Sequence, residues 1–210
     1  MGVLLEYMEN RMDQTVETYK KHFGKFIEHT QGLDKPNADI QKWIDDFLGY
    51  IQKGGTILEI GAAFGRDADY MKKQGYRVIC TDIAEEAIDK LEAKGYEVHL
   101  YDVRDAPPTD WQRHFDGYFA NAVLLHLSDE AFKSALEYAY DMLKHGGVAA
   151  FSVKIGTGEE VTTRKMDSPR YFRYYYKPEL ETIISGLPFE ILQLVYTHDE
   201  KWIVAILRKR

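Results

Sequence analysis

Three acidic residues and one glycine-bracketed loop are the parts of this sequence best suited to chemistry. Glu59 ends a short run of aliphatic and β-branched residues, and a loop from Gly61 to Gly65 follows at once. Glycines let the backbone turn sharply and come close to a ligand, and the N-terminus of a following helix would point at that ligand. Asp82 and Asp102 follow the next two such runs. Their carboxylates could accept hydrogen bonds from ribose hydroxyls and from an adenine amino group, which indicates a nucleotide-like ligand.

The same residues have a plainer interpretation. Asp82 and Asp102 could simply cap the loops or helices that follow them. The glycine spacing is G-x-x-x-G, with Ala63 where a dinucleotide fingerprint has its second glycine, so the loop alone is a weak signal. The combination of this loop with two acidic strand ends is what favours a ligand site.

Alternating strands and helices must position these residues. Apolar runs predict strands over residues 56–60, 77–81, 97–101, 115–120 and 148–153. Helices are expected between them, including one that Ser128 caps and that Gly146-Gly147 terminates. This alternation is typical of a parallel sheet with helices on both faces, which brings the acidic strand ends to one edge.

The N-terminal part of the chain precedes this alternation. Apolar residues at three- and four-residue spacing predict a helix that ends at residues 31–34, and Pro36 opens a second helix. We therefore expect residues 1–50 to form an N-terminal helical lid and residues 51–210 to form one compact domain. The apolar stripe consists of Met8, Met12, Val16, Tyr19, Phe23 and Phe26.

The C-terminal part departs from the alternation as well. Residues 154–177 are polar and then strongly aromatic, and a short helix is expected over 178–185. Two strands, over 189–196 and 201–207, are joined by a short polar turn. A parallel pair would need a crossover connection, so this pair must be antiparallel.

Composition restricts the possible partners and locations. The net charge of −7 argues against a broad nucleic-acid footprint, and no apolar stretch approaches the roughly 18 residues of a membrane span. The single cysteine, Cys80, lies in an apolar run, which predicts a buried thiol. No compact Asp/Asn cluster predicts a metal site. We expect a cytoplasmic monomer or homodimer with a small-molecule partner, no nucleic acid and no membrane.

Several ordered motifs resemble those of the class I S-adenosylmethionine (SAM)-dependent methyltransferases, small-molecule type. Residues 57–67 resemble the glycine-rich first motif, 81–83 and 101–103 the acidic motifs after the next two strands, and 119–126 and 143–147 later segments. The resemblance covers about residues 50–207. It implies a Rossmann-like doubly wound sheet of about seven strands, mostly parallel with an antiparallel terminal hairpin. Ala63 replaces a common glycine and His145 a common proline.

The resemblance also implies which residues contact SAM and its product S-adenosylhomocysteine (SAH). The loop after the first strand would meet the methionine part, the acidic motifs the ribose and adenine, and the N-terminal helix would cover the cofactor. For Tyr19, simple packing on the apolar stripe fits equally well. The cofactor candidates are Tyr19, Glu59, Gly61, Ala62, Ala63, Gly65, Arg66, Asp82, Ile83, Asp102, Val103, Asn121 and Ala122.

The acceptor side is less defined. His126, just beyond the fourth strand, is the candidate general base because imidazole titrates near neutral pH, although packing at the start of a helix explains it as well. Aromatic residues with interspersed arginines could enclose a planar or anionic acceptor. An extended edge whose tyrosines cover the sheet is the alternative. The substrate-side candidates are Arg164, Arg170, Tyr171 and Tyr174.

The sequence therefore predicts a SAM-dependent methyltransferase with an unidentified, small-molecule acceptor. Methyl transfer requires the protein mainly to align the nucleophile and exclude water, so no diagnostic catalytic constellation is needed. One alternative is a SAM-binding module that senses the cofactor without transferring methyl. A nicotinamide-dependent oxidoreductase is disfavoured by the G-x-x-x-G spacing and the terminal hairpin.

Overall fold

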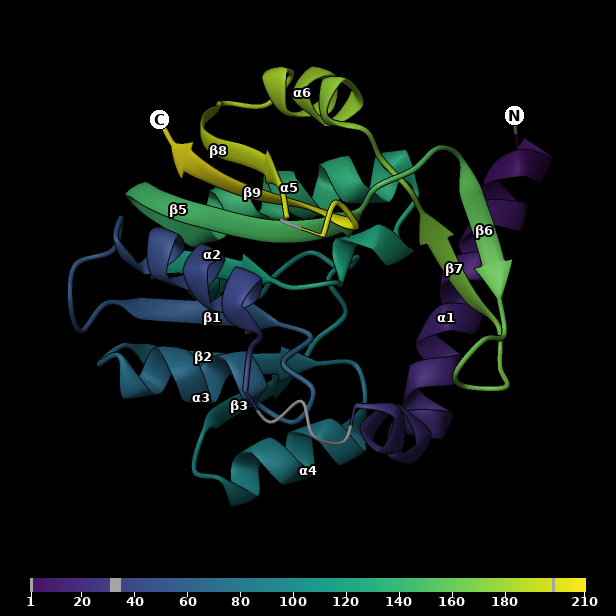
Figure 1. Cartoon of the computed structure of the whole chain (residues 1–210), viewed down its shortest axis with the longest axis horizontal. Coiled ribbons are helices and arrows are strands. Elements are labelled where there is room, and N and C mark those ends of the chain that lie inside the picture. The colour runs from purple at the N-terminus through teal and green to yellow at the C-terminus, as the bar shows by residue number, and fades with distance from the viewer. Residues whose placement is uncertain (1, 31–34, 198) are drawn as a thin grey trace.

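A seven-stranded sheet runs through the molecule in the order β3-β2-β1-β4-β5-β9-β8 (Figure 1). The computed structural model describes residues 2–30, 35–197 and 199–210, with side chains from residue 9 onward. The pairs among β1 to β5 are all parallel, and β9 runs antiparallel to both β5 and β8. The Rossmann-like fold predicted from the sequence is confirmed. The strands of this sheet are β1 (Thr56–Ile60), β2 (Arg77–Asp82), β3 (Glu97–Leu100), β4 (Phe115–Ala120), β5 (Leu143–Lys154), β8 (Phe189–Tyr196) and β9 (Trp202–Lys209).

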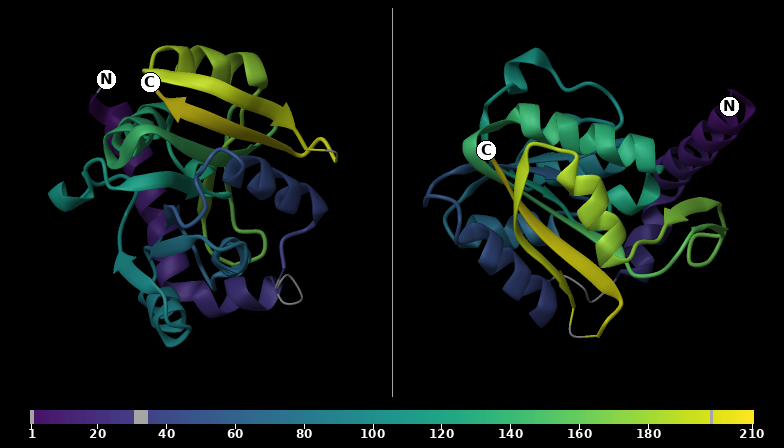
Figure 2. Two further views of the ribbon diagram at one scale, coloured as in Figure 1. Left: turned by 90° about the vertical axis from the view of Figure 1, so that its left-hand side faces the viewer. Right: turned by 90° about the horizontal axis from the view of Figure 1, so that it is seen from above.

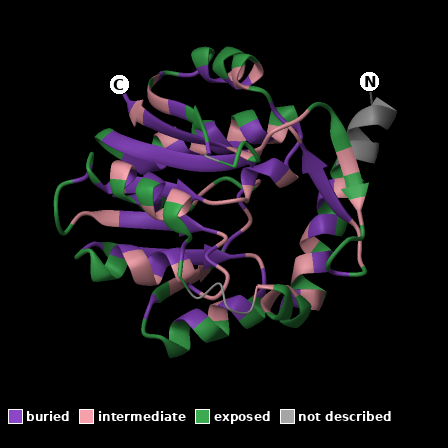
Figure 3. Cartoon of the chain, viewed as in Figure 1, coloured by how far each residue is buried: buried purple, intermediate pink, exposed green. Residues whose placement is uncertain are grey.

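Helices cover both faces of the sheet (Figure 2). Neighbouring residues of β1 show why: Ile57 packs in the core that contains Trp43 and Phe47, whereas Leu58 packs in the core on the other side. Consecutive strand side chains point to opposite faces, so a strand apolar throughout needs cover on both (Figure 3). One face carries α2 (Ala38–Leu48), α3 (Arg66–Lys73) and α4 (Glu85–Ala93). The other face carries α5 (Asp129–Met142) and α6 (Lys177–Ser185). Two short 3-10 turns, η1 (Thr109–Trp111) and η2 (Leu124–His126), lie in the connections between strands.

The expected boundary between α5 and β5 is wrong. Ser128 caps α5 as predicted, but the helix ends at Met142 and β5 begins at Leu143 rather than at 148. The pairing of β4 with β5 shifts register between Phe115 and Gly117. Gly146 has a φ of +76°, a backbone conformation that L side chains rarely adopt. The Gly146-Gly147 pair therefore belongs to an irregular turn within β5, not to the helix end.

A small antiparallel sheet was not predicted from the sequence. It pairs β6 (Glu159–Thr162) with β7 (Arg170–Arg173) inside the aromatic segment after β5. The backbone N–H of Tyr171 donates to Thr15 Oγ1 at 2.8 Å, and Thr18 Oγ1 donates to the carbonyl of Pro169 at 2.7 Å. These bonds attach the small sheet to α1 (Gly2–His29), which lies beside it (Figure 1).

Helix α1 bridges two parts of the protein. Its helical geometry breaks at His22 (φ −124°, ψ 26°), and beyond this break Phe23 packs against Ala84 and Ala87 at α4. The predicted end of the helix at residues 31–34, like His198 in the β8–β9 turn, lies outside the described residues.

Helix α2 behaves differently from α1, although both precede the first strand. Trp43 and Phe47 of α2 are buried in the core, and Trp43 Nε1 donates to the carbonyl of Ala205 at 3.3 Å. Cys80 is fully buried, as predicted. Within the described part of the chain, no helix combines the length and apolar character that crossing a bilayer requires.

Candidate functional site

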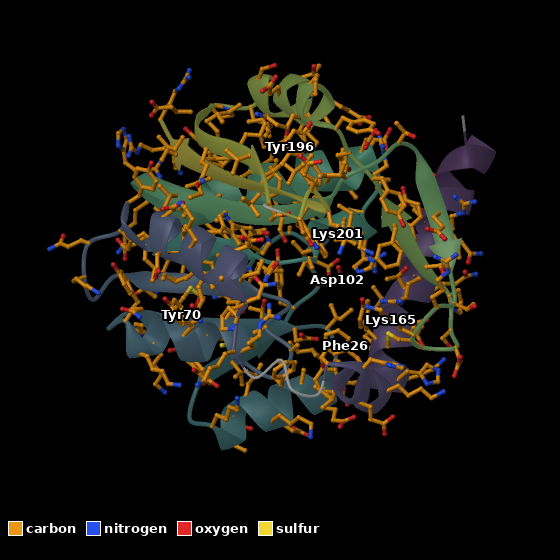
Figure 4. The ribbon with its side chains drawn as sticks, viewed as in Figure 1. Phe26, Tyr70, Asp102, Lys165, Tyr196 and Lys201 are labelled. Carbon is orange, nitrogen blue, oxygen red and sulfur yellow. The ribbon has the colours of Figure 1, made fainter. Side chains whose placement is uncertain are left out.

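A cavity of about 590 Å³ lies at the carboxyl ends of β1 to β4, beneath α1. Figure 4 shows Phe26 from α1, Asp102 from the end of β3 and Lys165 from the β6–β7 connection around the same space. The predicted apolar stripe of α1 faces this cavity. Its lining residues from that stripe are Met12, Val16, Tyr19, Phe23 and Phe26.

Glu59 is a carboxylate buried without a partner for one of its oxygens. Its side chain is only 3% exposed, and Oε2 accepts no hydrogen bond from the described residues. Burial raises the pKa of Glu59 well above its ordinary value, and the negative charge of Asp67 adds to this effect while Arg66 opposes it. Buried polar atoms normally have partners, so an unpartnered oxygen in a cavity wall is suited to a ligand donor such as an ammonium group.

The loop after β1 needs its glycines for two different reasons. Gly61 has a φ of +65°, and a Cβ there would lie 2.6 Å from Val123 Cγ2, so a larger residue would collide with the cavity wall. Gly65 has a φ of +83° and precedes α3, but it does not line the cavity, and a Cβ there would meet Leu91. Gly65 therefore shapes the turn rather than facing a ligand.

Asp82 holds this loop and also lines the cavity. Its Oδ2 accepts the backbone N–H of Ala63 and its Oδ1 that of Ala84, both at 2.9 Å. Burial raises the pKa of Asp82, and these two backbone hydrogen bonds oppose the rise. Ala63 has a φ of +52°, a conformation that costs an L residue about 1–2 kcal/mol. The bond to Asp82 explains how alanine stands where the resembled motif has glycine.

Asp102 also lines the cavity, but its carboxylate is already paired. Arg104 Nε lies 3.0 Å from both carboxylate oxygens of Asp102, and Nη2 lies 2.7 Å from Oδ2. The remaining nitrogen, Nη1, donates to Asp13 Oδ1 of α1 at 2.8 Å. No pattern in the sequence indicated the contact between Arg104 and Asp13, because these two residues are 91 positions apart in the chain.

Asp67 is a buried cavity acid that was not predicted. Arg66 donates to both of its oxygens, at 2.7 and 2.9 Å, and Asn121 Nδ2 donates to Oδ2 at 2.7 Å. Ser152 Oγ in turn donates to Asn121 Oδ1 at 2.7 Å and accepts the backbone N–H of Ala122 at 2.8 Å. Asp67 therefore fixes two predicted cofactor contacts, Arg66 and Asn121. The sequence signal that could have found Asp67 is its place in the first turn of α3, where a carboxylate is favourable.

Tyr19, His126 and the backbone of β7 form a hydrogen-bonded chain. His126 Nδ1 lies 2.6 Å from the carbonyl oxygen of Tyr171, which can only accept, so Nδ1 carries the proton. Nε2 is then free to accept from the Tyr19 hydroxyl at 3.0 Å, and Arg170 Nη1 donates to the same hydroxyl oxygen at 3.3 Å. Burial lowers the pKa of His126 to about 3, and the positive charges of Arg170 and Lys154 contribute. His126 is therefore neutral at physiological pH with both ring nitrogens occupied.

Acidification is expected to destabilise the protein through His126. The folded-state pKa of about 3 lies below the unfolded value of about 6.5, so the unfolded state binds the extra proton as the pH falls through this window. The expected loss is about 2 kcal/mol between pH 6.5 and pH 5. Urea unfolding at these pH values should show a smaller loss for His126→Asn than for the wild type.

An exposed histidine provides the matched control for this experiment. His145→Asn should keep the wild-type pH dependence, because that side chain lies on the surface. The imidazole NMR signals of wild-type His126 should not titrate between pH 5.5 and 8. Titration near pH 6.5 would contradict the assigned neutral state.

The side of the cavity formed by β5 and the small sheet is rich in positive charge. Lys154 Nζ lies 4.4 Å from the centre of the Phe172 ring. Burial, together with nearby Lys165 and Arg170, lowers the pKa of Lys154, and the negative charge of Glu160 opposes this effect. Arg170 is 8% exposed, and its Nε has no hydrogen-bond partner among the described residues. The cavity-lining cations that take part in none of the ion pairs of the described residues are Lys154, Arg164, Lys165 and Arg170.

Three of the four substrate-side candidates line the cavity, and Tyr171 does not. Side chains alternate along β7, so with Arg170 and Phe172 at the cavity Tyr171 faces the core, where it is fully buried. For Tyr171, the interpretation as an aromatic core residue is therefore the one the structure supports. Tyr174 lines the cavity and donates to Glu160 Oε2 at 2.6 Å.

The structure brings nearly all the predicted cofactor residues to one cavity, Gly65 being the exception. Lys154 was not among the predicted site residues, although it is the last residue of β5. Glu59 and Asp82 were predicted because they lie at the carboxyl ends of strands, and the same criterion could have found Lys154. The described residues contain no group of three or more His, Cys, Asp or Glu side chains that could hold a metal ion. The predicted residues that line the cavity are Tyr19, Glu59, Gly61, Ala62, Ala63, Arg66, Asp82, Ile83, Asp102, Val103, Asn121, Ala122, His126, Arg164, Arg170 and Tyr174.

Comparison with known proteins gives a family match for the segment that forms much of this cavity wall. A family model described as a methyltransferase domain matches residues 57–147, which include the loop after β1, Asp82, Asp102 and Asn121. This match covers less than half of the 210 residues, and it shows that this segment of the chain is similar to a methyltransferase domain.

Two solved structures share the fold of this chain. The DhpI–SAH complex matches with a TM-score of 0.75 and 18% identity, covering 95% of this chain and 97% of that one. The 1,6-didemethyltoxoflavin-N1-methyltransferase of Burkholderia thailandensis, with bound 1,6-didemethyltoxoflavin and SAH, matches with a TM-score of 0.72 and 21% identity, covering 97% and 89%. At these identities the likeness concerns the fold.

A curated relative of this chain is phosphoethanolamine N-methyltransferase of Triticum aestivum. The two are 26% identical over 186 residues. The match covers 84% of this chain and 37% of the relative, so the chain spans little more than a third of that protein's length.

Proposed function

We propose that this chain transfers a methyl group from SAM to a small-molecule acceptor. The observation that carries the proposal is the buried Glu59 carboxylate, whose Oε2 is without a partner in the cavity wall at the end of β1. A buried charge without a partner is costly, and the ammonium group of the methionine part of SAM would supply one. A volume of about 590 Å³ is within the range of small-molecule and cofactor sites.

The residues of the cavity fit this cofactor. Gly61 and Ala62 leave little bulk beside Glu59, Asp82 and Ile83 would hold the ribose, and Asp102 would meet the adenine edge. The network of Arg66, Asp67 and Asn121 would fix the wall between these contacts. When bound, SAM supplies a methyl group already activated on a sulfonium, so the chain's own residues need only bind, orient and exclude water.

We propose that the acceptor carries an anionic group. Lys154 and Arg170 have no acidic partner in the ion pairs of the described residues, and their mutual repulsion would be relieved by a phosphate or carboxylate. The relative's name offers one candidate, because phosphoethanolamine combines a phosphate with an amine that can be methylated. Arg164 and Tyr174 would complete this end of the site.

We propose a positioning role for His126 in place of the general-base role expected from the sequence. Its Nε2 accepts from the Tyr19 hydroxyl, and its low pKa makes it a poor proton acceptor near neutral pH. His126 and Arg170 together would hold the Tyr19 oxygen at the cavity wall. Helix α1, which carries Tyr19 across the cavity, would act as the lid, whereas α2 forms part of the core.

Calorimetric titration tests the cofactor assignment. SAM and SAH should bind the full chain with a Kd of about 100 µM or tighter, a free energy of roughly −5.5 kcal/mol, whereas NAD should not bind. Binding of NAD without SAM or SAH would overturn the proposal in favour of an oxidoreductase.

A second experiment separates an enzyme from a cofactor sensor. Transfer of label from methyl-labelled SAM should be measured across a panel of small acceptors with and without phosphate or carboxylate groups. Label should enter anionic acceptors preferentially. Tight SAM binding without transfer to any acceptor would favour the sensing module.

A further inference from the structure

Arg104 stands between the expected adenine end of the cavity and the helix that covers it. Its guanidinium contacts both carboxylate oxygens of Asp102 on one side and Asp13 of α1 on the other. Its own backbone N–H also donates to Asp102 Oδ1 at 3.0 Å. The side chains of Arg104 and Asp102 are 23% and 19% exposed, so this ion pair is largely shielded, whereas Asp13 is 64% exposed.

The other ion pairs between α1 and the rest of the protein reach a different place. Arg11 pairs with Glu159 of β6, and Lys25 pairs with Asp167 in the β6–β7 connection, each at 3.3 Å. Among the ion pairs of the described residues, the one between Asp13 and Arg104 joins α1 to the loop after β3. This single contact can therefore link the seating of the lid to the adenine end of the site.

We propose that Arg104 is a positioning residue with two separable effects, a proposal that rests on the proposed function. First, Arg104 orients and neutralises Asp102, so that the carboxylate presents its remaining lone pairs to the 6-amino group of adenine. Second, through Asp13, it seats α1 over the cavity. A planar guanidinium with five donors can serve both carboxylates at once, which a lysine could not do in this geometry.

The charges around Asp102 support the first effect. Asp82, Asp67 and Glu59 line the same cavity, and Arg66 is already bound to Asp67. Without Arg104, Asp102 would be a further uncompensated acid in this wall. Its orientation would also be lost, because the guanidinium contacts and the Arg104 backbone N–H are the hydrogen bonds that the described residues give this carboxylate.

Two measurements on four variants separate these effects. The first is the ratio of the affinities for SAH and S-inosylhomocysteine, which carries an oxo group in place of the 6-amino group. The second is the rate of amide hydrogen exchange in residues 9–21 of α1, with and without SAH. Arg104→Gln is expected to lower the SAH preference about fivefold or more, the lower end of typical site-to-site coupling, and to speed exchange in α1.

Asp13→Asn should speed α1 exchange and SAH release but leave the preference for SAH within about twofold, because it cuts only the exposed end of the bridge. Asp13→Glu should restore the wild-type behaviour. Lys25→Gln is the control, since it cuts another ion pair of α1, one that is more exposed and does not reach Asp102, and it should change neither measurement.

Several results would overturn the proposal. An unchanged SAH preference in Arg104→Gln would exclude the first effect, and equal α1 exchange in Asp13→Asn and Lys25→Gln would exclude the second. Failure of the wild type to bind SAH would instead contradict the proposed function, and the effect of Arg104 on adenine recognition through Asp102 would fall with it. Exchange in the ligand-free variants would still decide whether Arg104 seats α1.

Discussion

Replacing Glu59 with glutamine is expected to weaken SAH binding while making the ligand-free protein more stable. Hydrogen bonds to charged groups contribute about 1.5–3 kcal/mol, so the Kd for SAH should rise roughly 10- to 150-fold. Glutamine keeps the shape of the side chain but removes the buried negative charge whose Oε2 has no partner. Calorimetry with SAH and urea unfolding of the ligand-free protein measure the two effects.

The stability gain of Glu59→Gln should depend on pH. The folded-state pKa of Glu59 is raised above its unfolded value of about 4.3, so the folded state binds the extra proton between these two values. Ionised Glu59 therefore costs stability, and this cost grows as the pH rises above about 4.3 until the folded-state pKa is passed. The variant and the wild type should have similar stabilities near pH 4 and diverge toward pH 7.

Glu92→Gln, on the exposed surface of α4, is the matched control. It removes the same charge outside the cavity and should leave both the SAH affinity and the pH dependence within error of the wild type. A Glu59→Gln variant that binds SAH as tightly as the wild type would contradict the assignment of Oε2 to the ligand. A variant less stable than the wild type at pH 7 would show that the charge is satisfied in the ligand-free protein.

Most of the sheet could be predicted because its signals are local. The apolar runs at residues 56–60, 77–81 and 115–120 match β1, β2 and β4 closely, and the short turn after residue 196 required an antiparallel pair. Ligands bind at the carboxyl ends of parallel strands in such sheets, and this principle located Glu59, Asp82 and Asp102 at one cavity without any long-range information. These predictions needed only periodicity and the direction of parallel strands.

The features that were missed depend on contacts between distant segments. The bridge from Asp13 through Arg104 to Asp102 exists only because α1 lies over the end of β3, and no local pattern encodes that placement. β6 and β7 are four residues each and, within the described chain, pair only with each other, beside α1 (Figure 1), so their sequence gives only a weak strand signal. Gly146 was interpreted as a helix end because a bulge needs the same backbone freedom as a helix terminus.

The acceptor end of the cavity provides the second large expected effect. Arg170→Gln is expected to lower kcat/KM for phosphoethanolamine about 10- to 150-fold, because a charge-assisted hydrogen bond of about 1.5–3 kcal/mol is lost. Transfer of label from methyl-labelled SAM to phosphoethanolamine and to ethanolamine, the same amine without the phosphate, gives the measurement. The wild type should prefer the phosphorylated amine, and the variant should lose most of that preference.

Two further readouts separate anion recognition from damage to the site. Inorganic phosphate should raise the Tm of the wild type more than that of Arg170→Gln, and the Kd for SAH should be measured alongside, since Arg170 also donates to the Tyr19 hydroxyl at the cavity wall. Lys165→Gln removes a neighbouring but exposed cation and should change kcat/KM less than threefold, because exposed charges are strongly screened.

If Arg170→Gln lost activity equally toward both amines, the arginine would act by holding the Tyr19 hydroxyl, to which it donates at 3.3 Å, and not by binding an anion. The charge of Arg170 argues for the anion, because its two hydrogen-bond acceptors, the Tyr19 hydroxyl and the Arg164 carbonyl, are both neutral and leave that buried charge uncompensated.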